Sequence, residues 1–202
     1  RRAAMTSSGS RGPHPVDTSG DPLTFALSGL MAEAPGTVRD YAIDSVDVDP
    51  GDGLILTEPV SGTMRLSRTN RGLVLDARLT TAIAGECARC LRPVVTAVKV
   101  RIDEEVLPSI DLASGMPVPL EEDGDPEAPR LTDHHELELR PLVIEAINLV
   151  EPIAPLCEPD CPGLCLECGE RLAPGHVHDD VAIDPRLEAL RAFRVDGSDD
   201  SG

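Results

Sequence analysis

The stretch Leu73-Val-Leu-Asp-Ala-Arg-Leu-Thr-Thr-Ala82 places apolar side chains at alternate positions, at Leu73, Leu75, Ala77 and Leu79. Successive side chains of a β-strand point to opposite faces, so this alternation predicts a strand with one buried and one exposed face. Strands of this kind are typical of antiparallel sheets that are covered on one side. We therefore expect a half-buried antiparallel strand over this stretch.

Further strand patterns lie on both sides of this stretch. Val98, Val100 and Ile102 alternate with polar residues, and the turn Thr69-Asn-Arg-Gly72 predicts a hairpin. The other segments expected in strands are Leu54–Thr57, Ser61–Ser67, Val94–Val106, Tyr41–Val48 and, as a strand or a short helix, Pro22–Leu30. The chain is therefore predicted to be α+β, with a β-rich antiparallel meander or open barrel followed by a helix and a Cys/His tail.

The helix is predicted by apolar residues that recur at helical spacing after Leu139. These residues are Leu142, Val143, Ala146, Ile147 and Val150. Pro141 is favoured in a first helical turn, and Pro152 ends the pattern. A second, shorter helix is predicted over Asp184–Arg194, which begins with a capping aspartate and a proline.

Composition divides the chain into five parts. Residues 1–21 are rich in Ser, Gly and Pro and are expected to be disordered, and residues 22–107 are expected to form the β-rich domain. Residues 108–135 form an acidic, proline-rich linker, because their charges repel one another and offer little core. Residues 136–180 hold the helix and the Cys/His tail, and residues 181–202 hold a short helix and a disordered acidic C-terminus.

Charge constrains the class of partner. The 202 residues carry 18 Lys and Arg against 36 Asp and Glu, a net charge of −18, which opposes attraction to a polyanion. The span Arg65–Arg101, however, holds eight basic and two acidic residues. This span is either a phosphate-binding surface or a set of strand faces balanced by distant carboxylates. Without an apolar run of about 18 residues or an apolar leader, we expect a cytoplasmic protein without a membrane partner.

Six cysteines occur in two groups, Cys87-x2-Cys90 and Cys157-x3-Cys161-x3-Cys165-x2-Cys168. Three disulfides are the alternative, but cytosolic thiols stay reduced, and clustered thiols there more often bind metal. Zinc takes four ligands in a tetrahedron, and two-residue spacing lets one tight turn present both thiolates to one ion. Gly169 after Cys168 permits such a turn.

Two histidines bring the candidate ligands to eight, so we expect one or two structural zinc ions. One compact module consists of Cys165, Cys168, His176 and His178. The ligands left for a second, long-range site are Cys87, Cys90, Cys157 and Cys161. The alternative for the two histidines is an exposed loop, and His134 and His135 beside the acidic linker are expected to be solvated.

Catalysis is the alternative to a scaffold role. A metal-dependent hydrolase with Glu86 or Glu167 as base needs an open ligand position, whereas eight donors fill two tetrahedra. The sequence contains neither Gly-x-Ser-x-Gly nor a Walker-type phosphate loop, so no catalytic residue is assigned. A redox or zinc-storage thiol module is a further alternative.

The two cysteine elements resemble those of the bacterial YceD family. They are Gly85-Glu-Cys-Ala-Arg-Cys-Leu-Arg-Pro-Val94 and Pro155-Leu-Cys-Glu-Pro-Asp-Cys-Pro-Gly-Leu-Cys-Leu-Glu-Cys-Gly169, and the resemblance covers roughly Pro22–Asp180. It implies a β-rich domain, a helix and a cysteine-bearing tail. It also implies a non-catalytic role in the accumulation of 23S ribosomal RNA.

The resemblance also suggests the partners, which are the 23S rRNA precursor or large-subunit ribosomal proteins. We expect Arg89 and Arg92, inside and beside the first Cys-x2-Cys element, to contact RNA phosphates. A protein-mediated role is the alternative, because the acidic segment Glu121–Glu127 could hold a basic ribosomal protein.

Overall fold

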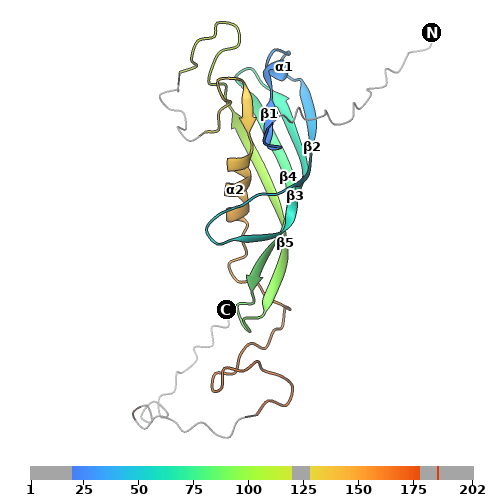
Figure 1. Cartoon of the computed structure of the whole chain (residues 1–202), viewed down its shortest axis with the longest axis vertical. Helices are drawn as coiled ribbons and strands as arrows, with labels where there is room; N and C mark the ends of the chain where they lie inside the picture. Colours follow the sequence, from blue (N-terminus) through green and yellow to red (C-terminus); the bar gives the residue numbers. More distant parts are fainter. Residues whose placement is uncertain (1–19, 120–127, 178–185, 187–202) are drawn as a thin grey trace, which may run out of the picture.

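The architecture is a four-stranded antiparallel sheet. A computed structural model describes residues 20–119, 128–177 and 186. The strands are β2 (Val38–Val46), β3 (Ile55–Arg68), β4 (Leu73–Glu86) and β5 (Pro93–Val106), in the order β2-β3-β4-β5. Each strand pairs with its neighbour in sequence, and the three long strands extend along most of the molecule (Figure 1). The predicted antiparallel meander is confirmed.

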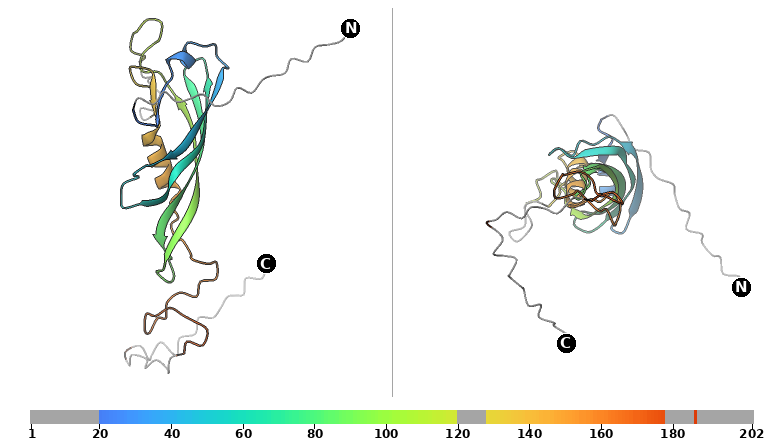
Figure 2. Two further views of the ribbon diagram at one scale, coloured as in Figure 1. Left: turned by 45° about the vertical axis from the view of Figure 1, so that its right-hand side comes forward. Right: turned by 90° about the horizontal axis from the view of Figure 1, so that it is seen from below.

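Two helices and a small second sheet complete the fold. β1 (Thr24–Ala26) pairs antiparallel with β6 (Glu136–Glu138), and α1 (Ser28–Met31) is a single turn. α2 (Arg140–Leu149) begins with a proline in its first turn, as the sequence predicts. It lies beside β5, and the view along the long axis in Figure 2 shows the sheet curving around it.

One hydrophobic core joins these elements. It contains the inward residues of all four strands of the large sheet together with Val143 and Ile147 of α2. At one end the rings of Phe25 and Tyr41 pack edge to face, with centroids 5.3 Å apart. Leu131, which lies in the range predicted as a linker, is also buried in this core.

Strand β3 differs from the prediction, which divided it into two short runs. The structure has one strand with register shifts between Leu56 and Glu58 and between Glu58 and Ser61. Pro59 lies in the second irregularity, where a bulge tolerates the missing backbone N–H. Gly62 follows with φ +156°, and a Cβ there would lie 2.1 Å from the carbonyl oxygen of Arg78.

The predicted hairpin between β3 and β4 is confirmed. The N–H of Thr69 donates to the carbonyl of Gly72 (2.9 Å), and the Thr69 hydroxyl oxygen accepts the N–H of Gly72 (3.0 Å). The Arg68 guanidinium donates to the carbonyls of Met31 (3.2 Å) and Gly72 (2.9 Å). Arg68, one of the eight basic residues of the span Arg65–Arg101, therefore stabilises this turn.

Several predicted features fall outside the described residues. These are the terminal tails, the acidic segment Glu121–Glu127 and, apart from Arg186, the helix over Asp184–Arg194. His134 is exposed as expected, but His135 is half-buried, and its Nε2 has no hydrogen-bond partner in the described part of the chain. No helix among the described residues is long and apolar enough to span a bilayer.

Candidate metal centres

The first Cys-x2-Cys element forms a tight turn at the tip of the β4–β5 hairpin. The N–H of Cys87 donates to the carbonyl of Arg92 (2.8 Å), and the N–H of Leu91 donates to the carbonyl of Cys87 (2.9 Å). Leu91 has φ +58°, a left-handed conformation that costs an L-residue energy. The turn buries both Cys87 and Cys90.

The second Cys-x2-Cys element forms the same turn. The N–H of Cys165 donates to the carbonyl of Glu170 (2.7 Å), and the N–H of Gly169 donates to the carbonyl of Cys165 (2.9 Å). Gly169 has φ +73° at the position equivalent to Leu91. The glycine at position 169 indicates a left-handed residue from sequence alone. The left-handed conformation of Leu91 could not be predicted in this way, because a leucine gives no sign of it.

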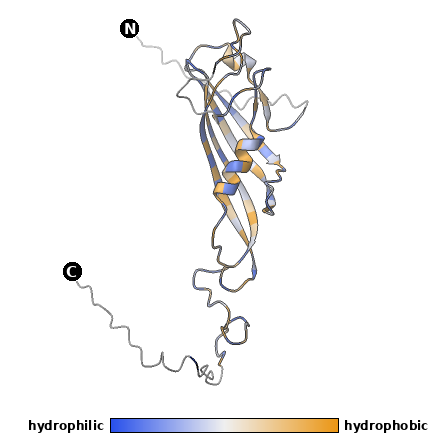
Figure 3. Cartoon of the chain, turned by 90° about the vertical axis from the view of Figure 1, so that its left-hand side faces the viewer, coloured by the Kyte–Doolittle hydropathy of each residue, from blue (hydrophilic) through white to orange (hydrophobic). Residues whose placement is uncertain are grey.

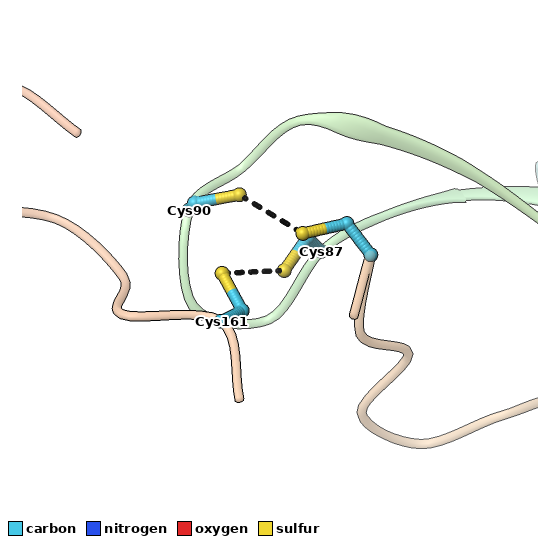
Figure 4. Close-up of side chains that lie close together, drawn as sticks. Cys87, Cys90 and Cys161 are labelled. Carbon is cyan, nitrogen blue, oxygen red and sulfur yellow. Dashed lines mark hydrogen bonds between the residues drawn. The ribbon is translucent and has the colours of Figure 1, made fainter. Parts of the chain in front are cut away.

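Four cysteine sulfurs from the hairpin tip and the C-terminal tail lie together. Sγ of Cys87 is 3.8 Å from that of Cys161, and Sγ of Cys90 is 3.7 Å from that of Cys157. All four sulfurs lie within 4.8 Å of one another, and Figure 4 shows three of them converging. Four sulfurs about 2.3 Å from a tetrahedral zinc are about 3.8 Å apart, whereas a disulfide bond is about 2.05 Å long. This first cluster therefore has the dimensions of a four-cysteine zinc site and could hold a metal ion.

Polar contacts around the first cluster also join the tail to the hairpin tip. The N–H of Ala88 donates to the carbonyl of Pro155 (2.8 Å), and Nη1 of Arg89 donates to the carbonyl of Cys161 (3.0 Å). Arg92 lies 3.8 Å from a carboxylate oxygen of Glu158. Arg89 and Arg92, the predicted RNA contacts, thus both contact the tail, and both remain exposed.

The protonation of the first cluster is uneven. Burial acts to raise the pKa of Cys87, but surrounding N–H and S–H donors outweigh it and lower the pKa to about 6. The pKa of Cys161 is raised to about 12, first by burial and then by the neighbouring thiols, against one N–H donor from Gly163. Close, buried sulfurs cannot all be ionised together, and a cation among them favours the thiolate of each.

A second cluster consists of Cys165, Cys168 and His176. Their donor atoms lie within 4.8 Å of one another, and Sγ of Cys168 is 3.6 Å from Nε2 of His176. Backbone N–H groups of Cys168 and Glu167 lower the pKa of Cys165 to about 6. His178, the fourth predicted ligand, lies outside the described residues. The second cluster thus brings together three of the four predicted ligands and could hold a metal ion.

Carboxylates outside the basic span Arg65–Arg101 pair with two of its residues. Arg65 donates to both carboxylate oxygens of Asp40 (2.7 and 3.1 Å), which is its partner in the register of β2 and β3. On β5, Arg101 donates to Asp103 (2.9 Å). Both aspartates lie outside the span that the sequence count covered. The charges of two of the eight basic residues are thus compensated by acids outside the span, which supports the interpretation of strand faces balanced by carboxylates elsewhere.

Comparison with known proteins extends these observations. The family model described as "Large ribosomal RNA subunit accumulation protein YceD" matches residues 75–194, which include all six cysteines. The chain belongs to the YceD family. The family name implies a role in the accumulation of large-subunit ribosomal RNA, and it describes an accumulation factor rather than an enzyme.

Similar proteins occur in mycobacteria. Uncharacterized proteins of Mycobacterium tuberculosis (strain H37Rv) and Mycobacterium bovis are each 34% identical over 167 residues, which cover 80% of this chain and 73% of each relative. An uncharacterized protein of Mycobacterium leprae is 33% identical over 129 residues, 63% of this chain and 55% of the relative. No solved structure matches the chain.

Proposed function

We propose that this YceD-family chain is a non-catalytic factor in large-subunit biogenesis that supports the accumulation of 23S rRNA in the cytoplasm. Its scaffold contains two structural zinc ions. The observation that carries the proposal is the first cluster, where sulfurs separated by 67 and 74 residues in sequence meet at tetrahedral spacing. Zinc there joins the tail to the hairpin tip and so fixes the surface that the two present together.

The proposed ligand sets follow from the two clusters. The first ion is held by Cys87, Cys90, Cys157 and Cys161. The second ion is held by Cys165, Cys168, His176 and His178, of which the first three lie together. Four thiolates fill the tetrahedron of the first ion and leave no position for a reacting water, which supports a structural rather than a hydrolytic role.

The proposed partners are the 23S rRNA precursor or large-subunit ribosomal proteins. Arg89 and Arg92 remain the proposed RNA contacts, because zinc and the tail hold both at the exposed tip of the molecule. Titration with 23S fragments compares wild type with an Arg89→Lys, Arg92→Lys variant and an Arg89→Ala, Arg92→Ala variant. We expect weaker binding and a smaller salt dependence for the alanine variant alone. Equal affinity in all three proteins would remove these arginines from the proposed site.

Depletion of the protein in its own host tests the proposed function. We expect a selective loss of 50S particles and of 23S relative to 16S rRNA, restored by wild type but not by a Cys87→Ser, Cys157→Ser variant. Zinc content of the purified proteins is measured in parallel, because the variant is expected to retain only the second ion. Balanced subunits after depletion would overturn the role in large-subunit biogenesis.

A further inference from the structure

α2 carries apolar side chains on the side that faces away from the core. Val143 and Ile147 are buried, whereas Leu149 is 80% exposed, and Ile153, just after the helix, is fully exposed. Together with Pro141 and with Ile144, which is half-buried and also packs against the core, they form a surface that we call the α2 strip. A shallow groove of about 640 Å³ runs along its helical part, and Figure 3 shows this side of the molecule.

We propose that the α2 strip is the docking surface for a cationic amphipathic helix of a protein partner. This inference rests on the proposed function, in which large-subunit ribosomal proteins are one class of partner. Pro141 and Ile144 are one turn apart, whereas Leu149 lies about 140° around the helix from Ile144, so Ile144 and Leu149 flank the groove and Glu145 and Asn148 lie between them. The groove between these flanks suits a second helix whose apolar side chains pack against Pro141, Ile144 and Leu149.

The charge around the strip indicates a cationic partner. Residues 141–157, which hold α2 and the segment after it, contain no Lys, Arg or His and two carboxylates, Glu145 and Glu151. Glu145 lines the groove itself, and Glu151 follows the helix. At the other end, Arg140 donates to both carboxylate oxygens of Asp21 at 2.6 Å, so its charge is compensated. An apolar strip with a carboxylate rim complements lysines and arginines that flank a leucine-rich face.

The same charge argues against RNA at this surface. Phosphates approaching α2 meet Glu145 and Glu151, and the cation that lines the groove, Arg140, is already paired with Asp21. The α2 strip therefore suits a protein partner, whereas the proposed RNA contacts lie at the hairpin tip.

The full-length, zinc-loaded protein is titrated with a fluorescein-labelled helical peptide of leucine and lysine, in which leucines form one face. We expect saturable binding that weakens with salt, and binding about tenfold or more weaker for a Leu149→Ser, Ile153→Ser variant. A Leu112→Ser, Met116→Ser variant is the matched control, because it removes two exposed apolar side chains elsewhere. A peptide of the same composition with scrambled order tests the need for an apolar face.

The outcomes separate this inference from the proposed function. Equal affinity for wild type and the strip variant, or equal affinity for the scrambled peptide, would overturn the docking surface. In the depleted host, we expect the strip variant to fail to restore 23S rRNA while the control variant succeeds. Restoration by both variants would overturn the docking surface and leave the proposed function standing. If the wild type fails to bind the peptide and instead binds 23S fragments through the α2 strip, the surface is an RNA-binding surface. That result would overturn the proposal of a protein partner.

Discussion

Removal of one sulfur from the first cluster tests whether metal holds the tail. We expect Cys157→Ser to abolish binding of the first ion, because three thiolates and a hydroxyl form a poorer zinc site. The tail segment 152–161 should then separate from the hairpin tip. The sheet should persist, since its core does not include the cysteines.

The free energy that holds the tail against the hairpin tip can be compared with the cost of ordering the tail. Two hydrogen bonds, from Ala88 to Pro155 and from Arg89 to Cys161, contribute together about 1–3 kcal/mol. Fixing the backbone of the ten residues 152–161 costs about 10–20 kcal/mol. A structural zinc site contributes about 10–16 kcal/mol, which offsets that cost, whereas the hydrogen bonds alone do not.

Hydrogen exchange measured by mass spectrometry provides the assay. Residues 85–92 and 152–161 should lose protection in Cys157→Ser and in chelator-treated wild type, while β3 and β4 keep theirs. Cys168→Ser is the matched control, because it removes a sulfur from the second cluster only and should leave both segments protected. Undiminished protection of 152–161 in metal-free protein would refute the reasoning.

Three further predictions concern stability of the zinc-loaded chain, measured by urea unfolding. Leu91→Gly should raise the free energy of unfolding by about 0.5–1 kcal/mol, since glycine relieves the left-handed strain and Leu91 is exposed; a lower midpoint would contradict this. Gly62→Ala should lower the free energy of unfolding by more than about 3 kcal/mol, because the new Cβ would overlap a carbonyl oxygen of β4. Gly20→Ala is the control and should leave that free energy unchanged, because a Cβ at Gly20 would meet no atom. Asp21→Asn should cost at most about 1 kcal/mol at neutral pH. Arg140 lowers the pKa of Asp21, so this difference should vanish as pH falls through that lowered pKa, and a difference that persists in acid would exclude the ion pair as its source.

Local sequence patterns predicted much of the fold. The alternation at Leu73, Leu75, Ala77 and Leu79 predicts β4 with its buried face, because the two-residue period of a strand is a property of the backbone. The apolar spacing after Pro141 predicts α2 for the same kind of reason. Pro59 misled the prediction of β3, since its effect depends on whether a bulge removes the need for its N–H.

The candidate metal centres were predictable in part. Spacing grouped Cys165 and Cys168 with His176, and it left four other cysteines for one site, which the structure brings within 4.8 Å. The count of basic residues in the span Arg65–Arg101 did not reveal that two of them pair with carboxylates outside it. Asp40 opposes Arg65 only through the pairing of β2 with β3, which a count along the chain does not include.

The sequence by itself determined the family, the class of fold, the positions of the main strands and α2, and the supply of metal-ligating side chains. These properties depend on residue identity and on short-range periodicity. Only the tertiary structure decided that Arg89 and Arg92 contact the tail, that Leu91 adopts a left-handed conformation and that Leu149 and Ile153 remain exposed among the described residues. Those features arise where segments distant in sequence meet, and local patterns do not specify which surfaces come together.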